Sequence, residues 1–181
     1  MKHFILTGAP GAGKTAILRQ LEILGFPVVE EAATDVIALA SAKGVAEPHA
    51  SPAFIDAILD LQNRRRSTLA LSPAEIAFHD RSAVCTLALA DFLGFAPSPG
   101  LTQNLQAIAV ERFYEKRVFF IRNLGFIKNT DARRISFEDS VRFEQVHEQT
   151  YRRLGYDLVI IEPGGVVDRA RRIVDMVTGI E

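Results

Sequence analysis

The residues with the clearest chemical meaning lie in the segment from Gly8 to Thr15, which reads GAPGAGKT. The spacing G-x-x-x-x-G-K-T is that of a phosphate-binding loop, or P-loop. Its glycines let the backbone approach an anion closely, and successive amide N–H groups can point inward at phosphates. The lysine supplies a positive charge, and the threonine hydroxyl can bind Mg²⁺. We therefore expect a nucleotide site made of Gly8, Ala9, Pro10, Gly11, Ala12, Gly13, Lys14, Thr15 and Ala16.

The residues that flank this motif match the strand, loop and helix that a P-loop requires. Residues 3–7 are mostly apolar, which is typical of a short buried parallel strand. Apolar residues between Ile17 and Leu24 recur on one helical face, and Gly25 follows as a helix stop. The alternative, a glycine-rich turn with an incidental lysine, does not explain this flanking pattern.

Composition narrows the class of protein. The 181 residues, 48% of them hydrophobic, suffice for one domain with a sizeable core. A net charge of -1 gives no overall attraction to nucleic acid or to a membrane surface, so we expect neither as a partner. Cys85 is the only cysteine, which excludes an intrachain disulfide and suits a reducing compartment. Because no apolar run reaches the ~18 residues of a membrane span, we expect a cytoplasmic protein. Its oligomeric state stays open.

Strand-like and helix-like segments alternate along the chain. The predicted strands are residues 3–7, 26–30, 74–80, 117–122 and 157–162. The predicted helices are 17–24, 31–42, 53–71, 83–92, 102–115, 136–154 and a terminal helix with Val167, Ala170, Ile173, Val174 and Val177 on its inner face. This alternation predicts an α/β fold of the P-loop NTPase type: one domain over residues 1–181, with a five-stranded parallel sheet in a three-layer αβα sandwich. Ligands of such sheets bind at the carboxyl ends of the strands.

Two acidic positions end predicted strands. Asp80, in the sequence Asp80-Arg81-Ser82, stands where P-loop proteins place the acid that holds Mg²⁺, so we predict a metal site at Thr15 and Asp80. The alternative is that Asp80 and Ser82 only cap the next helix. Arg81 could bind acceptor or phosphate oxygens, or form a surface salt bridge.

Glu30 and Glu31 end the second predicted strand. A carboxylate at this point could accept the proton of an acceptor hydroxyl or bind the metal through water. The alternative is an acidic helix start that interacts with the helix dipole. Of the two residues we select Glu31 as the catalytic candidate.

The polar segment around Asp131-Ala132-Arg133-Arg134 precedes a helix that Ser136 and Asp139 should cap. We predict a lid over residues 126–136, in which Arg133 and Arg134 stabilise charge on the γ-phosphoryl oxygens. The alternative is that both arginines are simply solvated. The remaining arginine pairs and the run 64–66 are expected to be mostly solvated, and neither His79 nor Cys85 receives a chemical role.

Together these segments resemble the NadR-like AAA domains, a group of P-loop ATPases and kinases named partly for the nicotinamide riboside kinase region of NadR. The resemblance covers nearly the whole chain and rests on GAPGAGKT, Val28 to Ala33, His79 to Ser82, Val118 to Phe120, Asp131 to Arg134, and the spacing of Tyr151, Gly155 and Tyr156. It implies a lid and a functional carboxylate in the Asp-Arg-Ser element. The chain has no room for the adenylyltransferase domain of NadR or for the helical domain of ring-forming AAA+ machines, and nothing in it selects nicotinamide riboside as acceptor.

These observations lead to a functional hypothesis with one alternative. The leading interpretation is a kinase that transfers the γ-phosphoryl group of Mg·ATP to a hydroxyl of an unidentified, nucleoside-like small molecule, with Lys14, Glu31, Asp80, Arg133 and Arg134 as catalytic residues. ATP is favoured over GTP because the base-reading element Asn-Lys-x-Asp is absent. The alternative is a nucleotide-binding regulatory ATPase, or switch, that has no small-molecule acceptor.

Overall fold

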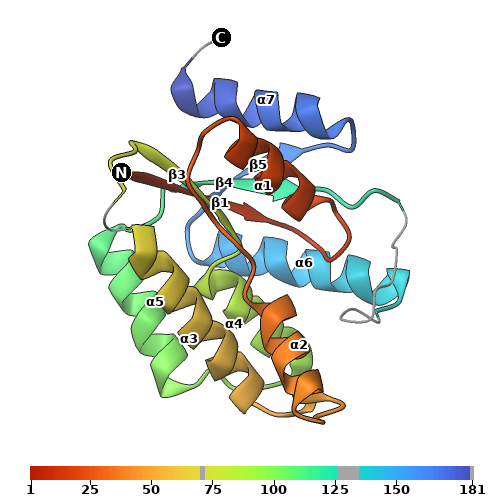
Figure 1. Ribbon diagram of the computed structural model, residues 1–181. Helices are drawn as coiled ribbons and strands as arrows, with labels where there is room; N and C mark the ends of the chain where they lie inside the picture. The colour runs from red at the N-terminus through yellow and green to blue at the C-terminus, as the bar shows by residue number, and fades with distance from the viewer. Residues whose placement is uncertain (70–71, 126–134, 180–181) are drawn as a thin grey trace.

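In the computed structural model, which describes residues 1–69, 72–125 and 135–179, a parallel sheet lies between two layers of helices (Figure 1). The strands are β1 (Lys2–Thr7), β2 (Val28–Val29), β3 (Ile76–Asp80), β4 (Arg117–Ile121) and β5 (Asp157–Ile161). Within the described chain the sheet has five strands in the order β2-β3-β1-β4-β5. Because β1 is central, the loop that follows it opens at the middle of the carboxyl edge of the sheet. The predicted three-layer α/β architecture is confirmed.

Helices cover both faces of this sheet. They are α1 (Lys14–Ile23), α2 (Ala33–Ala42), α3 (Ala53–Thr68), α4 (Ala83–Leu93), α5 (Pro99–Glu111), α6 (Phe137–Arg153) and α7 (Val166–Thr178), and a short 3-10 turn, η1 (Pro48–Ala50), lies between α2 and α3. Figure 1 shows α1 and α7 on one face and α3, α4, α5 and α6 on the other. No helix of the described residues is long and apolar enough to cross a lipid bilayer.

The side chains of β1 alternate between the two layers, as the period of a strand requires. Phe4 and Leu6 are buried in the cluster that includes apolar residues of α1 and α7. Ile5 is buried in the larger cluster on the opposite face, together with residues of α3, α4 and α5. The central strand is therefore enclosed on both sides, which holds the start of the P-loop in a fixed position.

Serine side chains cap the N-termini of α4 and α6. The hydroxyl of Ser82 accepts a hydrogen bond from the amide of Val84 at the start of α4, and Gly94 ends that helix with a left-handed φ of 77°. The hydroxyl of Ser136 accepts from the amide of Asp139 at the start of α6, so the predicted cap is confirmed. Ser82 therefore caps α4, as the alternative interpretation of the Asp-Arg-Ser element proposed, whereas Asp80 accepts a hydrogen bond from the Thr15 hydroxyl.

Several predicted boundaries were wrong. Helix α5 begins at Pro99 and ends at Glu111, whereas 102–115 was predicted, because Ser98 caps it with proline in the first turn and Arg112 turns left-handed (φ 50°) after it. Strand β2 has two residues and α3 ends at Thr68. Val167 is 50% exposed and does not lie on the inner face of α7.

Candidate functional site

The first and last glycines of the P-loop occupy positions where a larger residue would be strained. Gly8 follows β1 with a φ of +126°, and a Cβ at this position would lie 2.3 Å from the carbonyl oxygen of Ile121 in β4. Gly13 has a φ of +85°, and a Cβ there would lie 3.0 Å from a guanidinium nitrogen of Arg169. Because Gly13 is the N-cap of α1, no side chain at that position occupies the first amides of the helix. The first amides of α1 are therefore available to an anion, as at other helix N-termini that bind phosphate.

Lys14 folds back over this loop. Its Nζ donates to the carbonyl oxygens of Gly8 (3.0 Å) and Ala9 (2.7 Å), and the residue is only 6% exposed. The side chains of Ala9 and Ala12 are fully buried, whereas Thr15 and Ala16 are exposed. The nine predicted nucleotide-site residues thus form one continuous loop and helix start, in which Ala9 and Ala12 are buried in the protein.

Asp80 and Thr15 meet at the carboxyl edge of the sheet. Strand register pairs Leu6 with Asp80, which brings the end of β3 beside the P-loop. The Thr15 hydroxyl donates to Asp80 Oδ2 at 3.1 Å, while Asp80 Oδ1 is buried and has no hydrogen-bond partner within the described part of the chain. Burial raises the pKa of Asp80, although the positive charge of Lys14 opposes that shift.

This pair fits an Mg²⁺ ion by the chemistry of its donors. A hydroxyl and an unsatisfied carboxylate oxygen are the oxygen ligands that Mg²⁺ prefers, and Mg²⁺ usually keeps several waters and phosphate oxygens as further ligands. The described residues contain no cluster of three or more His, Cys, Asp or Glu side chains suited to a metal. The protein would supply only part of the coordination.

The two neighbouring glutamates have different environments. Glu30 is exposed, and its carboxylate pairs with Arg19 at 2.6 Å. The Glu31 side chain is only 12% exposed and accepts hydrogen bonds from Arg81 Nε (2.5 Å) and from the Thr34 hydroxyl (2.7 Å). Glu31, the residue selected from the sequence, is the one that faces inward.

Arg81 is a buried partner and not a surface ion-pair residue. The residue is 9% exposed, and its backbone has a left-handed φ of 74°, which is uncommon outside glycine. Its amide donates to the carbonyl oxygen of Leu6, which links the turn after β3 to the end of β1. Burial alone would lower the pKa of Arg81, but the charge of Glu31 raises it above its ordinary value, so the guanidinium stays charged.

Three further residues contact this site, and the sequence analysis did not predict them. Arg65 of α3 donates to the carbonyl oxygen of Glu31 and pairs with Asp35, so it is not a solvated arginine as expected. Arg169 of α7 is 6% exposed and donates to the Ala12 carbonyl oxygen (3.1 Å) beneath the P-loop. The third, His147 of α6, contacts Arg81. The sequence carried no signal for these contacts, because each joins segments far apart in the chain.

Arg133 and Arg134 lie outside the described residues, together with most of the predicted lid, 126–136. The described end of that segment adjoins α6, where the Ser140 hydroxyl contacts the carbonyl oxygen of Pro10 at 3.3 Å. The start of α6 is therefore tied directly to the P-loop.

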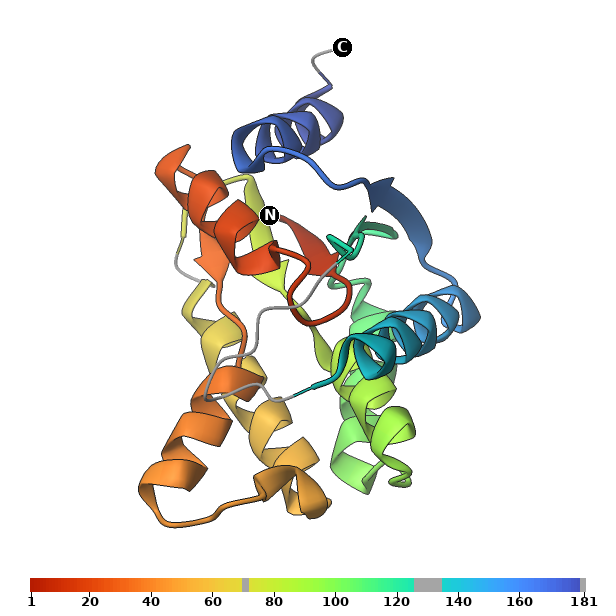
Figure 2. The ribbon, with the colours of Figure 1, turned by 90° about the vertical axis from the view of Figure 1, so that its right-hand side faces the viewer.

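A cavity of about 570 Å³ opens beside the P-loop. Figure 2 looks toward the P-loop, with α2 and α3 on one side and α4 and α6 on the other. Pro10, Glu31 and Arg81 line the cavity, as do apolar side chains that include Phe54, Ile58, Leu89, Phe92 and Phe143. The loop suited to phosphate and the inward carboxylate thus share one apolar-walled space.

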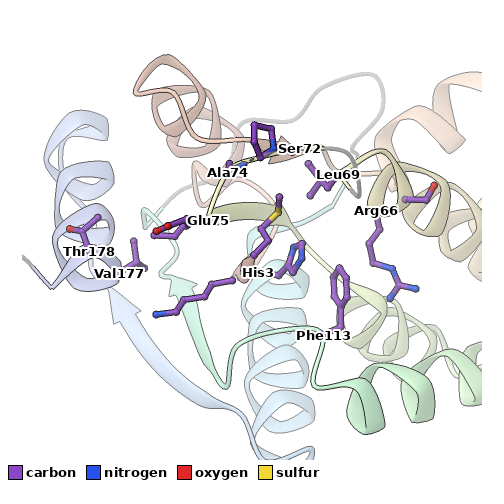
Figure 3. A pocket seen from close by; sticks show the side chains of 14 residues that line it. His3, Arg66, Leu69, Ser72, Ala74, Glu75, Phe113, Val177 and Thr178 are labelled. Atoms are coloured by element: carbon purple, nitrogen blue, oxygen red, sulfur yellow. Dashed lines mark hydrogen bonds between the residues drawn. The ribbon is translucent and has the colours of Figure 1, made fainter.

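A second cavity, of about 1140 Å³, lies at the opposite end of the strands. Figure 3 shows His3 and Arg66 beside the ring of Phe113 in this cavity, where the Arg66 guanidinium lies 4.7 Å from the ring centre. Lys2 and Ile76, which begin β1 and β3, also line it. Because the P-loop follows the other end of β1, this cavity is not part of the site described above.

Comparisons with known proteins identify the family and the fold of the chain. The profile of a family described as AAA domain matches residues 3–169. The chain belongs to this family. Its fold is similar to that of two NadR structures, in complex with NR and with NAD and AMP-PNP, which superpose with TM-scores of 0.72 and 0.71 at 18% and 19% identity. Each alignment covers 99% of this chain and about half of the NadR chain (51% and 50%).

A shikimate kinase from Acinetobacter baumannii in complex with shikimate has the same fold, with a TM-score of 0.54 at 15% identity over 99% of this chain and 94% of that one. No curated protein sequence matches the chain. At these identities the structural likeness establishes the fold, so the chemistry has to be argued from the residues of this chain.

Proposed function

We propose that the protein is a small-molecule kinase that transfers the γ-phosphoryl group of ATP to a hydroxyl group of an acceptor. The observation on which this proposal rests is the shared cavity, because Pro10 of the P-loop and the Glu31 carboxylate line the same space. A regulatory ATPase has no need for an acceptor cavity beside its phosphate loop. The presence of AMP-PNP in one NadR complex supports ATP as the donor.

The nucleotide would lie along the P-loop from Gly8 to Ala16. Loop amides and the first amides of α1 would hold the β- and γ-phosphates. Lys14, whose Nζ now donates to Gly8 and Ala9, would turn to the phosphates when they bind. Arg133 and Arg134 remain the proposed groups that stabilise charge on the transferred phosphoryl group.

Thr15 and Asp80 would hold Mg²⁺. When bound, the ion supplies positive charge that neutralises the phosphate oxygens. Asp80 and Thr15 would then orient the nucleotide, which is the phosphoryl donor, while Glu31 would face the hydroxyl of the acceptor.

Glu31 would bind the acceptor hydroxyl and accept its proton. In the transfer, the acceptor oxygen forms a bond to the γ-phosphorus and the bond between that phosphorus and the β–γ bridging oxygen breaks, so that ADP leaves. The hydroxyl proton passes to the Glu31 carboxylate. Arg81 Nε, 2.5 Å from that carboxylate, keeps it ionised and oriented before the transfer.

The charges in the cavity favour an uncharged, nucleoside-like acceptor. Two positively charged side chains, Arg81 and Arg142, are among the described residues that line the cavity. Arg81 is paired with Glu31, and Arg142 lies over the ring of Phe92 (4.8 Å) and pairs with Asp139 (3.2 Å). Aromatic and aliphatic walls suit the flat body of such an acceptor, and the polar inner end suits its hydroxyl.

A coupled assay of ADP formation tests the proposal. The panel contains uncharged nucleosides, sugars and aromatic alcohols, with nucleoside monophosphates and hydroxy acids as charged counterparts, each with Mg·ATP. We expect an uncharged member to accelerate ADP formation well above the rate with water alone. Glu31→Gln should lower kcat by about a hundredfold or more, because general base catalysis is lost.

Glu30→Gln is the matched control, since Glu30 is the adjacent glutamate but is exposed and paired with Arg19. It should leave kcat unchanged. If no panel member accelerates ADP formation while Mg·ATP protects the protein from trypsin better than Mg·ADP does, the regulatory alternative is correct and the kinase proposal is wrong.

A further inference from the structure

His147 is a buried, titratable side chain for which the proposed reaction has no direct use. It lies in α6 and is fully buried. Its Nδ1 is 2.9 Å from the carbonyl oxygen of Phe143, and its Nε2 is 3.0 Å from Arg81 Nη1. Because a carbonyl oxygen can only accept, Nδ1 carries the proton and Nε2 accepts from the guanidinium.

The neutral form of this histidine is the one that the surroundings favour. Burial, followed by the positive charge of Arg81, lowers the pKa of His147 well below its ordinary value. A protonated ring would have no lone pair at Nε2 for Arg81. The contact therefore has one direction, from arginine to histidine.

Arg81 needs such a partner. Its backbone is left-handed (φ 74°), so the preferred directions of its side chain are not those of an ordinary strand end. Two contacts hold the guanidinium, with Nε on Glu31 Oε1 at 2.5 Å and Nη1 on His147 Nε2 at 3.0 Å. Two contacts from different sides fix the plane of a guanidinium, whereas one would leave it free to rotate.

The same face of α6 also contacts Ser82, the residue that follows Arg81. Tyr151, one helical turn after His147, has its hydroxyl 2.8 Å from the Ser82 hydroxyl and 3.1 Å from Cys85 Sγ. Tyr151 is also fully buried. Helix α6 thus contacts Arg81 and Ser82 through two side chains four residues apart, which lie on one face of a helix.

We propose that His147 is a positioning residue, which fixes the Arg81 guanidinium so that Arg81 holds the Glu31 carboxylate toward the acceptor cavity. The importance of that carboxylate rests on the proposed kinase function, whereas the relay His147, Arg81 and Glu31 is a property of the fold. The two can therefore fail separately.

Two substitutions of His147 distinguish the roles of its two ring nitrogens. In His147→Asn the amide can replace Nδ1 but does not reach Arg81, and in His147→Gln the amide oxygen can replace Nε2 as the acceptor. Tyr151→Phe is the matched control, because it removes a buried hydrogen bond from the same face of α6 and leaves the contact between His147 and Arg81 in place.

The first readout is the hydrogen exchange of the Arg81 Nε–H in ¹⁵N-labelled protein, with the signal assigned by its loss in Arg81→Lys. We expect exchange at least about tenfold faster in His147→Asn than in wild type, because the hydrogen bond to Glu31 opens more often. In His147→Gln and Tyr151→Phe the rate should stay within about threefold of wild type. An unchanged rate in His147→Asn, or equal acceleration in His147→Asn and Tyr151→Phe, would overturn the proposal.

The second readout is kinetic and uses the acceptor that the panel identifies. His147→Asn should lower kcat by about tenfold or more with KM for Mg·ATP within about twofold, and His147→Gln should recover most of kcat. A rise in KM for Mg·ATP with kcat unchanged would contradict a role that acts through Glu31. If the panel yields no acceptor, the exchange measurement still decides whether His147 positions Arg81.

Discussion

Substitution of the two adjacent glutamates by glutamine should separate a buried ion pair from an exposed one. In the pair of Glu31 with Arg81 the side chains are 12% and 8% exposed and 2.5 Å apart. Glu31→Gln removes the negative charge and leaves the buried guanidinium without the carboxylate that it is paired with, which costs about 3 kcal/mol of unfolding free energy. That loss is roughly a hundredfold change in the unfolding equilibrium constant.

Glu30 gives the comparison, because its pair with Arg19 is of similar length (2.6 Å) but both side chains are nearly half exposed. Water and salt screen such a pair, so Glu30→Gln should not change stability measurably. Urea unfolding followed by circular dichroism suits the assay, since the chain has no tryptophan. Equal losses for both variants, or a Glu31→Gln variant as stable as wild type with an unchanged m value, would refute the assignment of Glu31 to a buried pair.

Three other predictions concern the loop, its support and acid stability. Gly8→Ala should abolish Mg·ATP binding in calorimetry, because the added Cβ would lie 2.3 Å from a backbone oxygen of β4; binding close to wild type would contradict this geometry. Arg169→Met should weaken Mg·ATP binding by about tenfold through loss of its hydrogen bond to the P-loop, whereas the exposed Arg172→Met should not; equal affinities would remove Arg169 from the site. Burial lowers the pKa of His3 to about 4 and that of His79 to about 3, so the unfolded chain binds more protons below about pH 6.5 and stability should fall from there toward pH 4. His79→Gln should reduce that loss in urea unfolding, and an unchanged pH profile would show that His79 does not contribute.

The parts of the fold that depend on local pattern could be predicted from the sequence. The P-loop from Gly8 to Thr15 could be predicted because close approach of a backbone to phosphate requires particular residue types at neighbouring positions. Asp80 could be placed because acids at the ends of parallel strands meet at one edge of a sheet. The predicted start of α5 at residue 102 was wrong, because Ser98 followed by Pro99 already forms a capped helix start.

The contacts between distant segments could not be predicted in this way. His147 stands four residues after Phe143 and four before Tyr151, so helical spacing places it on the face of α6 that these residues share, but it does not identify the partner of its ring. Its partner Arg81 is 66 residues away in the chain, and Arg169 is 157 residues from Ala12. Such pairs exist only once the layers have packed. The roles of Arg133 and Arg134 stay predictions, because both lie outside the described residues.

The claim on which the account depends is that the loop from Gly8 to Thr15 binds the phosphates of ATP. Isothermal titration of Mg·AMP-PNP into wild type and Lys14→Ala, with folding of both checked by circular dichroism, tests it most directly. The account predicts saturable binding at one site and a loss of affinity of roughly a hundredfold in Lys14→Ala, since a charge-assisted contact to phosphate is removed. No binding by wild type, or equal binding by both proteins, would contradict it.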